Sequence, residues 1–181
     1  QTVRRKIIDP WLNGCAREGI DFKGILYPGI MVTARGPLVL EFNARFGDPE
    51  TQVYLTRLKN DLVELMDASL EARLDRVTLE WTPLVAVCVV IASRGYPGSY
   101  TKGKVIRGLD ILAQRPEVKV FHAGTARAGN DIVTAGGRVL GITAWADTLA
   151  AARDKAYAAV DSIQFEGAHY RRDIGSQALL S

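Results

Sequence analysis

Residues 38–46 read Leu-Val-Leu-Glu-Phe-Asn-Ala-Arg-Phe, and their strict alternation constrains the fold more than any other stretch of the chain. Such alternation predicts a β-strand, because successive side chains of a strand point to opposite faces of the sheet. One face is wholly apolar and requires a core; it carries Leu38, Leu40, Phe42, Ala44 and Phe46. The other face carries Val39, Glu41, Asn43 and Arg45, at roughly 6.6 Å per pair of residues.

The polar face of this strand has the chemistry of a nucleotide site. Mg²⁺ takes oxygen ligands from one or two protein groups and completes its shell with water and phosphate. Glu41 and Asn43 can supply such oxygens to one ion, and Arg45 can donate bidentately to a phosphate or carboxylate. The alternative is an ordinary half-exposed strand in which Glu41 and Arg45 are solvated charges.

The residues after the strand favour the nucleotide site. Residues 47–50, Gly-Asp-Pro-Glu, predict a helix start with Asp48 at the N-cap and Pro49 at the first helical position. The whole run 41–52, Glu-Phe-Asn-Ala-Arg-Phe-Gly-Asp-Pro-Glu-Thr-Gln, resembles the signature of the glycinamide ribonucleotide synthetase (phosphoribosylamine–glycine ligase) family. These are ATP-grasp ligases of purine biosynthesis. The resemblance implies that Asp48 also helps to position the substrate glycine, and both roles stay open.

Composition agrees with a soluble enzyme. The 181 residues are 48% hydrophobic and 24% charged, with a net charge of +3 and no long run of one sign. We find no nucleic-acid signature, no apolar stretch of membrane-spanning length and no signal peptide, so we expect a cytoplasmic protein that binds neither nucleic acid nor membrane. Cys15 and Cys88 are isolated, and Cys88 stands in an apolar run where we expect a buried thiol. The chain opens on Gln1 without a Met, and we expect a fragment of a longer protein.

Periodicity and turn residues predict an alternation of helices and strands. We expect a helix over 2–18, which Pro10 and Gly14 should kink or end early, and a hairpin of strands 25–33 and 38–46 with a bulge at Pro28 and Gly29. Further predictions are a helix over 49–74, a linker over 75–83, a buried strand over 84–92, strands over 118–123, 132–134 and 138–144 with a turn at Gly136 and Gly137, and a helix over 148–163 capped by Asp147.

The loop 94–104 contains a second candidate residue, Lys102. Residues 98–104 match the start of a phosphate-binding P-loop, but Val105 stands where Ser or Thr is needed and no helix is expected there, so we reject that interpretation. On spacing alone this is a flexible loop with solvated lysines. Tyr-Pro-Gly-Ser-Tyr followed by Lys-Gly nevertheless resembles the C-terminal domain of the same family, which implies that Lys102 holds a substrate phosphate.

A third candidate patch lies near the end of the chain, where Arg171 and Arg172 follow the last predicted helix. Paired arginines of this kind are often a solvated surface, but their planar guanidinium groups also suit a phosphate dianion. A similar Arg-Arg element closes the C-terminal domain of the family, which implies that the pair binds the ribose phosphate of the substrate. His122 and His169 lack metal-ligand spacing, and we expect His122 to be a hydrogen-bonded strand residue.

The resemblance covers nearly the whole chain and implies a fold and a reaction. The implied fold class is α+β, with the C-terminal part of an ATP-grasp domain (an antiparallel sheet with helices) in residues 1–78 and a small mixed α/β substrate-binding domain in residues 79–181. In the implied reaction, ATP phosphorylates the carboxylate of glycine, and 5-phosphoribosylamine attacks the resulting glycyl phosphate. Glu41 and Asn43 would hold Mg²⁺ (or Mn²⁺) across the ATP phosphates. Arg45 would be catalytic, stabilising charge on the transferred phosphoryl group.

The chain also departs from the family pattern. The N-terminal glycine-rich domain and the lid over ATP are absent, and residues 27–29 offer no carboxylate where many ATP-grasp enzymes carry a further metal ligand. We therefore expect the missing N-terminal portion of the same protein to be a partner, and the isolated chain to be inactive. Two alternatives stay open: another ATP-grasp carboxylate–amine ligase of purine synthesis, and a non-catalytic fragment or scaffold.

Overall fold

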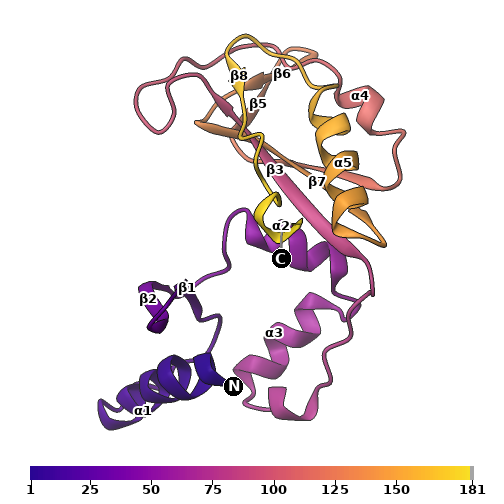
Figure 1. Cartoon of the computed structure of the whole chain (residues 1–181). Helices are drawn as coiled ribbons and strands as arrows, with labels where there is room; N and C mark the ends of the chain where they lie inside the picture. Colours follow the sequence, from indigo (N-terminus) through magenta and orange to yellow (C-terminus); the bar gives the residue numbers. More distant parts are fainter. Residues whose placement is uncertain (180–181) are drawn as a thin grey trace. The chain divides into compact units, whose positions relative to one another are not determined.

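A computed structural model describes residues 1–179 of the chain, which form the mixed arrangement of helices and antiparallel sheets expected from the sequence (Figure 1). The described residues divide into two compact units. Unit 1 consists of residues 1–47 and 59–80; unit 2 consists of residues 48–58 and of the chain from residue 81 onward. Residues 48–58, which we placed in the first predicted domain, thus belong to unit 2, and the functional assignment of the two predicted domains stays a prediction.

The N-terminal helix of unit 1 changes its hydrogen-bonding pattern instead of breaking at Pro10. A π-helical turn η1 (Arg4–Ile8) leads directly into α1 (Asp9–Arg17). Pro10 is the second residue of α1, directly after the π-helical turn, and it supplies no N–H group to the carbonyl groups of that turn. Gly14 lies inside α1 without ending it. The predicted helix therefore forms, and the expected early break does not.

Strands β1 (Tyr27–Thr33) and β2 (Gly36–Asn43) form a two-stranded antiparallel ribbon in unit 1. The predicted bulge is present: Gly29 pairs with Glu41 and Ile30 with Val39, so that Leu40 has no partner in β1. Our prediction of a strand to residue 46 is wrong, because Asn43 already pairs with Tyr27, the first residue of β1. The predicted apolar face also finds no core, since Leu40 is 67% exposed.

The predicted helix over 49–74 is wrong, because it is interrupted at residues 58–61. Helix α2 (Glu50–Arg57) belongs to unit 2, while α3 (Leu62–Leu70) and the short η2 (Leu74–Arg76) belong to unit 1. The Asp61 carboxylate caps α3 by accepting hydrogen bonds from the N–H groups of Val63 (2.7 Å) and Glu64 (3.3 Å). Asn60 and Asp61 therefore favour a new helix start over continuation.

Unit 2 is built on a four-stranded antiparallel sheet in the order β4 (Val118–His122), β7 (Arg138–Ala146), β3 (Val85–Ser93) and β8 (Ala168–His169). Helix α5 (Leu149–Val160) packs on β3 and β7 (Figure 1). A small second sheet pairs β5 (Thr125–Ala128) with β6 (Asp131–Thr134), and the short helices α4 (Leu109–Leu112) and η3 (Gln177–Leu179) complete the unit. The predicted strands 84–92, 118–123, 132–134 and 138–144 are confirmed, whereas β5, β8 and α4 were not predicted.

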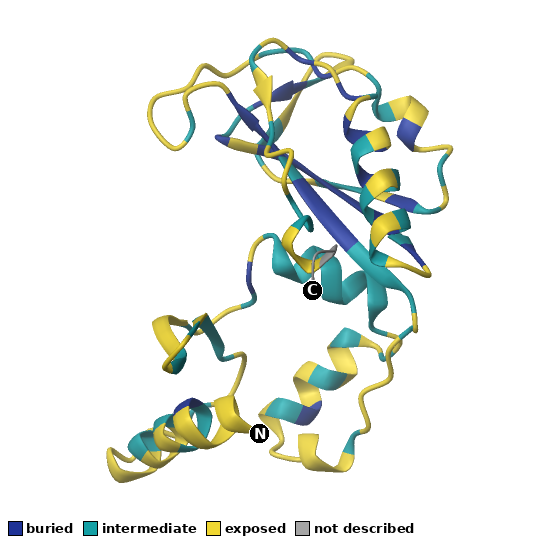
Figure 2. Ribbon diagram, viewed as in Figure 1, coloured by how far each residue is buried: buried dark blue, intermediate teal, exposed yellow. Residues whose placement is uncertain are grey.

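The core of unit 2 lies between the sheet and α5, and the buried segments of β3 and β7 are visible in Figure 2. The helix meets the sheet through alanines: Ala152, Ala156 and Ala159 are fully buried. The predicted cap of this helix is wrong by one position, because the Thr148 hydroxyl, and not Asp147, accepts the hydrogen bond from the Ala151 N–H (3.2 Å). Within residues 1–179, no helix combines the length and the apolar character needed to cross a membrane.

Candidate functional site

The two predicted metal ligands lie together on β2 in unit 1. The Asn43 side-chain amide donates to a Glu41 carboxylate oxygen at 2.9 Å. Gly29, opposite Glu41 in the bulge, leaves the space that the carboxylate side chain needs, because a Cβ at Gly29 would lie 3.2 Å from Glu41 Cγ. The sequence alternation and the bulge therefore produce an adjacent carboxylate and amide on one edge of the ribbon.

The donor set of this pair fits a hard divalent cation. After their mutual hydrogen bond, Glu41 and Asn43 still offer a carboxylate oxygen and an amide oxygen, the ligand types that Mg²⁺ and Mn²⁺ prefer. Among residues 1–179 there is no group of three or more His, Cys, Asp or Glu side chains arranged to hold a metal ion. An ion held by this pair would therefore complete its shell with ligands from outside these residues, and phosphate and water are ligands that Mg²⁺ commonly takes.

Arg45 lies outside the strand that carries the pair. It stands in a bend after the last residue of β2, is exposed, and donates from its guanidinium to the Phe46 carbonyl oxygen at 2.8 Å. The expectation that Arg45 shares one strand face with Glu41 and Asn43 is wrong, because β1 offers no partner beyond Asn43.

Asp48 is the first residue of the segment 48–58 in unit 2, and its carboxylate has two hydrogen-bond partners. It accepts from the Gln52 amide at 3.0 Å and from the Arg138 guanidinium at 3.2 Å. The N-cap prediction for Asp48 is wrong: Pro49 is the N-cap residue of α2, and no side chain caps the helix there. Arg138 also lies over the Tyr96 ring, 5.9 Å from its centroid, which makes it a member of this cluster that we did not predict.

The loop that carries Lys102 is not a P-loop, as expected. Val105 and Arg107 form isolated β-bridges where a P-loop would begin a helix. Lys102 itself is exposed, and among the described residues no ion pair to it is found. Its neighbour Lys104 pairs with a Glu166 carboxylate oxygen at 2.6 Å. Lys102 is therefore the lysine of this loop that is available to an anion.

Arg171 and Arg172 follow β8 in unit 2, and both are exposed. The two guanidinium groups differ in what they contact. Arg171 donates twice to the Asp173 carboxylate, at 2.9 Å and 2.6 Å, and this contact lowers the pKa of Asp173. Arg172 lies over the Tyr170 ring, 5.0 Å from its centroid. The pair is adjacent as predicted, with Arg171 facing a carboxylate and Arg172 an aromatic ring.

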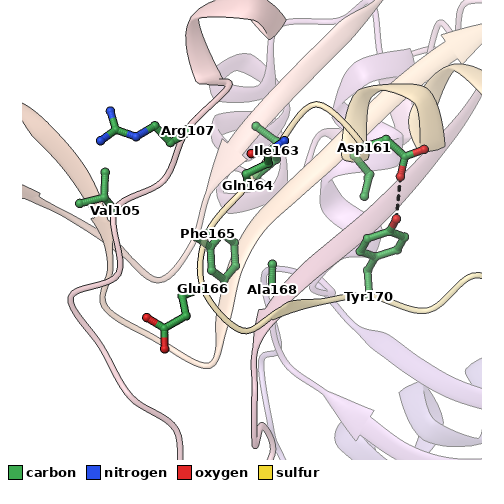
Figure 3. Close-up of a pocket in the computed structure, with 10 residues that line it drawn as sticks. Val105, Arg107, Asp161, Ile163, Gln164, Phe165, Glu166, Ala168 and Tyr170 are labelled. Carbon is green, nitrogen blue, oxygen red and sulfur yellow. Dashed lines mark hydrogen bonds between the residues drawn. The ribbon is translucent and has the colours of Figure 1, made fainter.

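A cavity of about 500 Å³ lies next to this arginine segment in unit 2 (Figure 3). Tyr170 and Asp161 line it and are joined by a hydrogen bond of 2.7 Å from the phenol to the carboxylate. A second cavity, of about 520 Å³, is lined by His122 and Trp145 among others, and none of the predicted site residues lines either cavity.

The remaining candidate residues have structural explanations. His122 lies in β4, and its Nδ1 is 3.0 Å from the Thr125 hydroxyl, as expected for a hydrogen-bonded strand residue. Cys88 is buried in β3, and burial raises the pKa of its thiol to about 11. The prediction of a buried Cys88 is confirmed, and the raised pKa leads us to expect a protonated, slowly reacting thiol at neutral pH.

Comparison with known proteins matches both ends of the chain to one enzyme. The family model described as "Phosphoribosylglycinamide synthetase, ATP-grasp (A) domain" matches residues 1–51, and the one described as "Phosphoribosylglycinamide synthetase, C domain" matches residues 86–177. A phosphoribosylamine–glycine ligase from Caldanaerobacter subterraneus is 50% identical over 174 residues, which is 96% of this chain and 41% of the relative. The chain thus spans about two-fifths of the length of that relative.

Comparison with solved structures leads to the same family. A phosphoribosylamine–glycine ligase from Thermotoga maritima superposes with a TM-score of 0.80 at 37% identity, over 94% of this chain and 41% of that one. An N5-carboxyaminoimidazole ribonucleotide synthetase from the same organism superposes with a TM-score of 0.56 at 15% identity over 87% of this chain and 41% of that one, a likeness of fold alone. The arrangement of helices and sheets and the matched residues lead to one conclusion: this chain belongs to the phosphoribosylglycinamide synthetase family.

Proposed function

We propose that this chain supplies metal-binding and substrate-binding parts of an ATP-dependent phosphoribosylamine–glycine ligase, which joins glycine to 5-phosphoribosylamine through a glycyl phosphate in purine biosynthesis. The observation that carries the proposal is the match of residues 1–51 and 86–177 to two domains of one synthetase. The adjacent Glu41 and Asn43 side chains support it, because they fit the cation that accompanies ATP.

Unit 1 would act on the phosphates of ATP. Glu41 and Asn43 would hold Mg²⁺ or Mn²⁺, which when bound neutralises charge on the phosphate oxygens. Arg45 would exchange its bond to the Phe46 carbonyl for a bond to the transferred phosphoryl group, where a guanidinium stabilises the developing negative charge. Arg45 is the catalytic residue of this proposal.

Unit 2 would hold the two other substrates. The Asp48 carboxylate, fixed by Gln52 and Arg138, would orient the glycine substrate. Lys102, Arg171 and Arg172 would bind the phosphate of 5-phosphoribosylamine, since all three are exposed cations. No general base is needed for the second step, because the amine of phosphoribosylamine is already a nucleophile.

A chimeric ligase tests this function. The part of the Caldanaerobacter relative that matches this chain, 41% of its length, is replaced by the present sequence, and ADP release is measured with glycine and phosphoribosylamine. We expect ADP release that depends on both substrates, a loss of about 100-fold in Glu41→Gln, and no release from the 181-residue chain alone. A folded but inactive chimera, or robust release by the chain alone, would contradict the proposal.

The two alternative functions are separated by further measurements on the same proteins. A panel of other carboxylate and amine substrates of purine synthesis, scored by ADP release from the chimera, distinguishes a different ATP-grasp ligase. Calorimetric titration of the chimera with Mg-ADP distinguishes a scaffold, which would give no heat of binding.

A further inference from the structure

One face of α5 contacts the segment 170–176 at several successive points. Arg153 and Tyr157 lie in α5 and Asp161 is its C-cap residue; the three are spaced four residues apart, so their side chains lie along one face of the helix. We call these three residues the α5 stripe. The segment that they contact contains Arg171 and Arg172.

Each residue of the α5 stripe makes a specific hydrogen bond to this segment. The Arg153 guanidinium donates to the carbonyl oxygens of Ile174 (3.1 Å) and Arg172 (3.1 Å). The Tyr157 hydroxyl donates to the Arg171 carbonyl at 2.8 Å and accepts from the Ile174 N–H at 3.0 Å. The Asp161 carboxylate accepts from the Tyr170 hydroxyl at 2.7 Å (Figure 3).

These contacts fix the backbone of the arginine pair and of the segment that follows it, because they involve the main-chain groups of residues 171, 172 and 174. They also fix the ring beneath Arg172: Tyr170 is tied to Asp161 while Arg172 lies over its face. Arg153 itself lies over the Tyr157 ring, 4.8 Å from its centroid, so the stripe is internally packed. The side chains of Arg171 and Arg172 project from a held backbone, not from a free chain end.

We propose that Arg153, Tyr157 and Asp161 are positioning residues for a phosphate bound by Arg171 and Arg172, with Tyr157 as the central contact. This inference rests on the proposed function, in which that pair, together with Lys102, binds the phosphate of 5-phosphoribosylamine. A held pair loses less conformational entropy on binding than two free side chains on a mobile segment, and so binds the same anion more tightly.

The test is the binding of ribose 5-phosphate to the 181-residue chain, followed by calorimetry and by the arginine Nε–Hε resonances in NMR spectra. Tyr157→Phe keeps the ring under Arg153 and removes both hydroxyl hydrogen bonds. We expect it to weaken binding about fivefold, as for one or two lost hydrogen bonds, and to reduce the ligand-induced shifts of Arg171 and Arg172. Ser162→Ala is the matched control, since it loses a hydroxyl hydrogen bond to the Ala158 carbonyl at the same helix end.

The outcomes separate this inference from the proposed function. Arg171→Ala/Arg172→Ala should abolish binding if the pair is the phosphate site. Loss of binding in that variant, with unchanged affinity and unchanged arginine shifts in Tyr157→Phe, would overturn the positioning role and leave the phosphate site standing. Binding that survives in Arg171→Ala/Arg172→Ala, or no binding by the unmodified chain, would overturn both. A melting temperature of Tyr157→Phe equal to that of Ser162→Ala ensures that the affinity change does not report general unfolding.

Discussion

The two units of the chain bury their apolar residues to very different extents. In unit 1, Ile7 and Ala68 are the buried hydrophobic side chains, while residues such as Val32, Leu40 and Val63 are between 65% and 81% exposed. In unit 2, a continuous core runs through β3, β7 and α5. Because burial of apolar surface is the main favourable contribution to folding, unit 2 contains most of the stabilisation that the described residues offer.

The contrast extends to the predicted functional residues. The candidate metal ligands stand on a ribbon of two strands, which is marginally stable by itself in water. The candidate phosphate-binding residues stand on a unit with a packed sheet and a covering helix. We therefore expect phosphate binding to be measurable on the chain as it is, and metal binding to depend on additional contacts that stabilise the ribbon.

The largest expected effect comes from adding a side chain at Gly108 in unit 2. This glycine has φ +89°, and a Cβ there would lie 1.9 Å from the Ser162 carbonyl oxygen. Gly108→Val should therefore lower the free energy of unfolding by about 4 kcal/mol or more. Urea unfolding followed by tryptophan fluorescence measures the change.

The matched change in unit 1 should have the opposite sign. Gly14 lies inside α1, and a Cβ there would meet no heavy atom within 4 Å. Gly14→Ala should raise the free energy of unfolding of unit 1 by up to about 1 kcal/mol, because alanine is the better helix former. If Gly14→Ala lowered the free energy of unfolding as much as Gly108→Val does, the two units would be equally closely packed around these glycines.

Thiol labelling provides the next comparison, with one cysteine in each unit. The pKa of Cys88 is raised to about 11 by burial, so at pH 8 about one in 1,000 of its thiols is ionised. Cys15 in unit 1 is only partly buried. We expect an aromatic disulfide reagent to modify Cys15 at least about 100-fold faster than Cys88 at pH 8.

The pH dependence of this reaction supplies its control. The rate at Cys88 should rise about tenfold per pH unit up to its pKa, since only the thiolate reacts. Unfolding in guanidinium should remove the difference between the two cysteines. Similar labelling rates in the folded chain would mean that β3 is open to solvent.

Truncating one leucine in each unit compares the packing of the two units directly. Leu140 is fully buried in β7, and Leu40 is 67% exposed in the ribbon. Leu140→Ala should lower the free energy of unfolding by about 3 kcal/mol, and Leu40→Ala by no more than about 0.5 kcal/mol. Denaturant midpoints of the two variants measure the difference, and a large effect at Leu40 would reveal a core that the described residues do not show.

The smallest effects are expected at surface ion pairs, one in each unit. Arg4 lies 3.5 Å from Asp9 in unit 1, and Arg171 lies 2.6 Å from Asp173 in unit 2, with all four side chains largely exposed. Asp9→Asn and Asp173→Asn should leave the melting temperatures nearly unchanged, because exposed pairs gain little over hydration. The difference in stability between the two units would then come from packing and not from surface ion pairs.

The Asp173 pair also has a predicted pH dependence. Arg171 lowers the pKa of Asp173 below its ordinary value of 3.8, so the small stabilisation is complete above that value and is lost as the pH falls through the lowered pKa. In Arg171→Gln the carboxyl resonance of Asp173 should titrate at a higher pH than in the unmodified chain. An unchanged titration would mean that the pair is not formed in solution.

Local signals predicted much of the fold. The apolar runs of β3 and β7 and the alanine-rich α5 were found because their patterns depend on nearest neighbours along the chain. The bulge was found because Pro28 and Gly29 fit a regular strand poorly. The break between α2 and α3 was missed, although Asp61 is a strong N-cap residue, because the apolar repeat continues across it.

The site was predictable only where its residues are close in sequence. Glu41 and Asn43 are two residues apart on one strand, so alternation alone brought them together. The bond between Asp48 and Arg138 joins residues 90 positions apart, and no local pattern indicates it. The α5 stripe had a readable spacing, but its role depends on the path of residues 170–176, which only the tertiary structure provides.

The three methyl groups beneath α5 set the separation between this helix and the sheet. Ala152, Ala156 and Ala159 have no room for a larger side chain, so a leucine at any of them would displace the helix outward. That displacement would shift the hydroxyl and guanidinium groups on the neighbouring face, and with them the loop that carries the paired arginines. The small volume of three buried residues would thereby limit how tightly the proposed site can hold an anion.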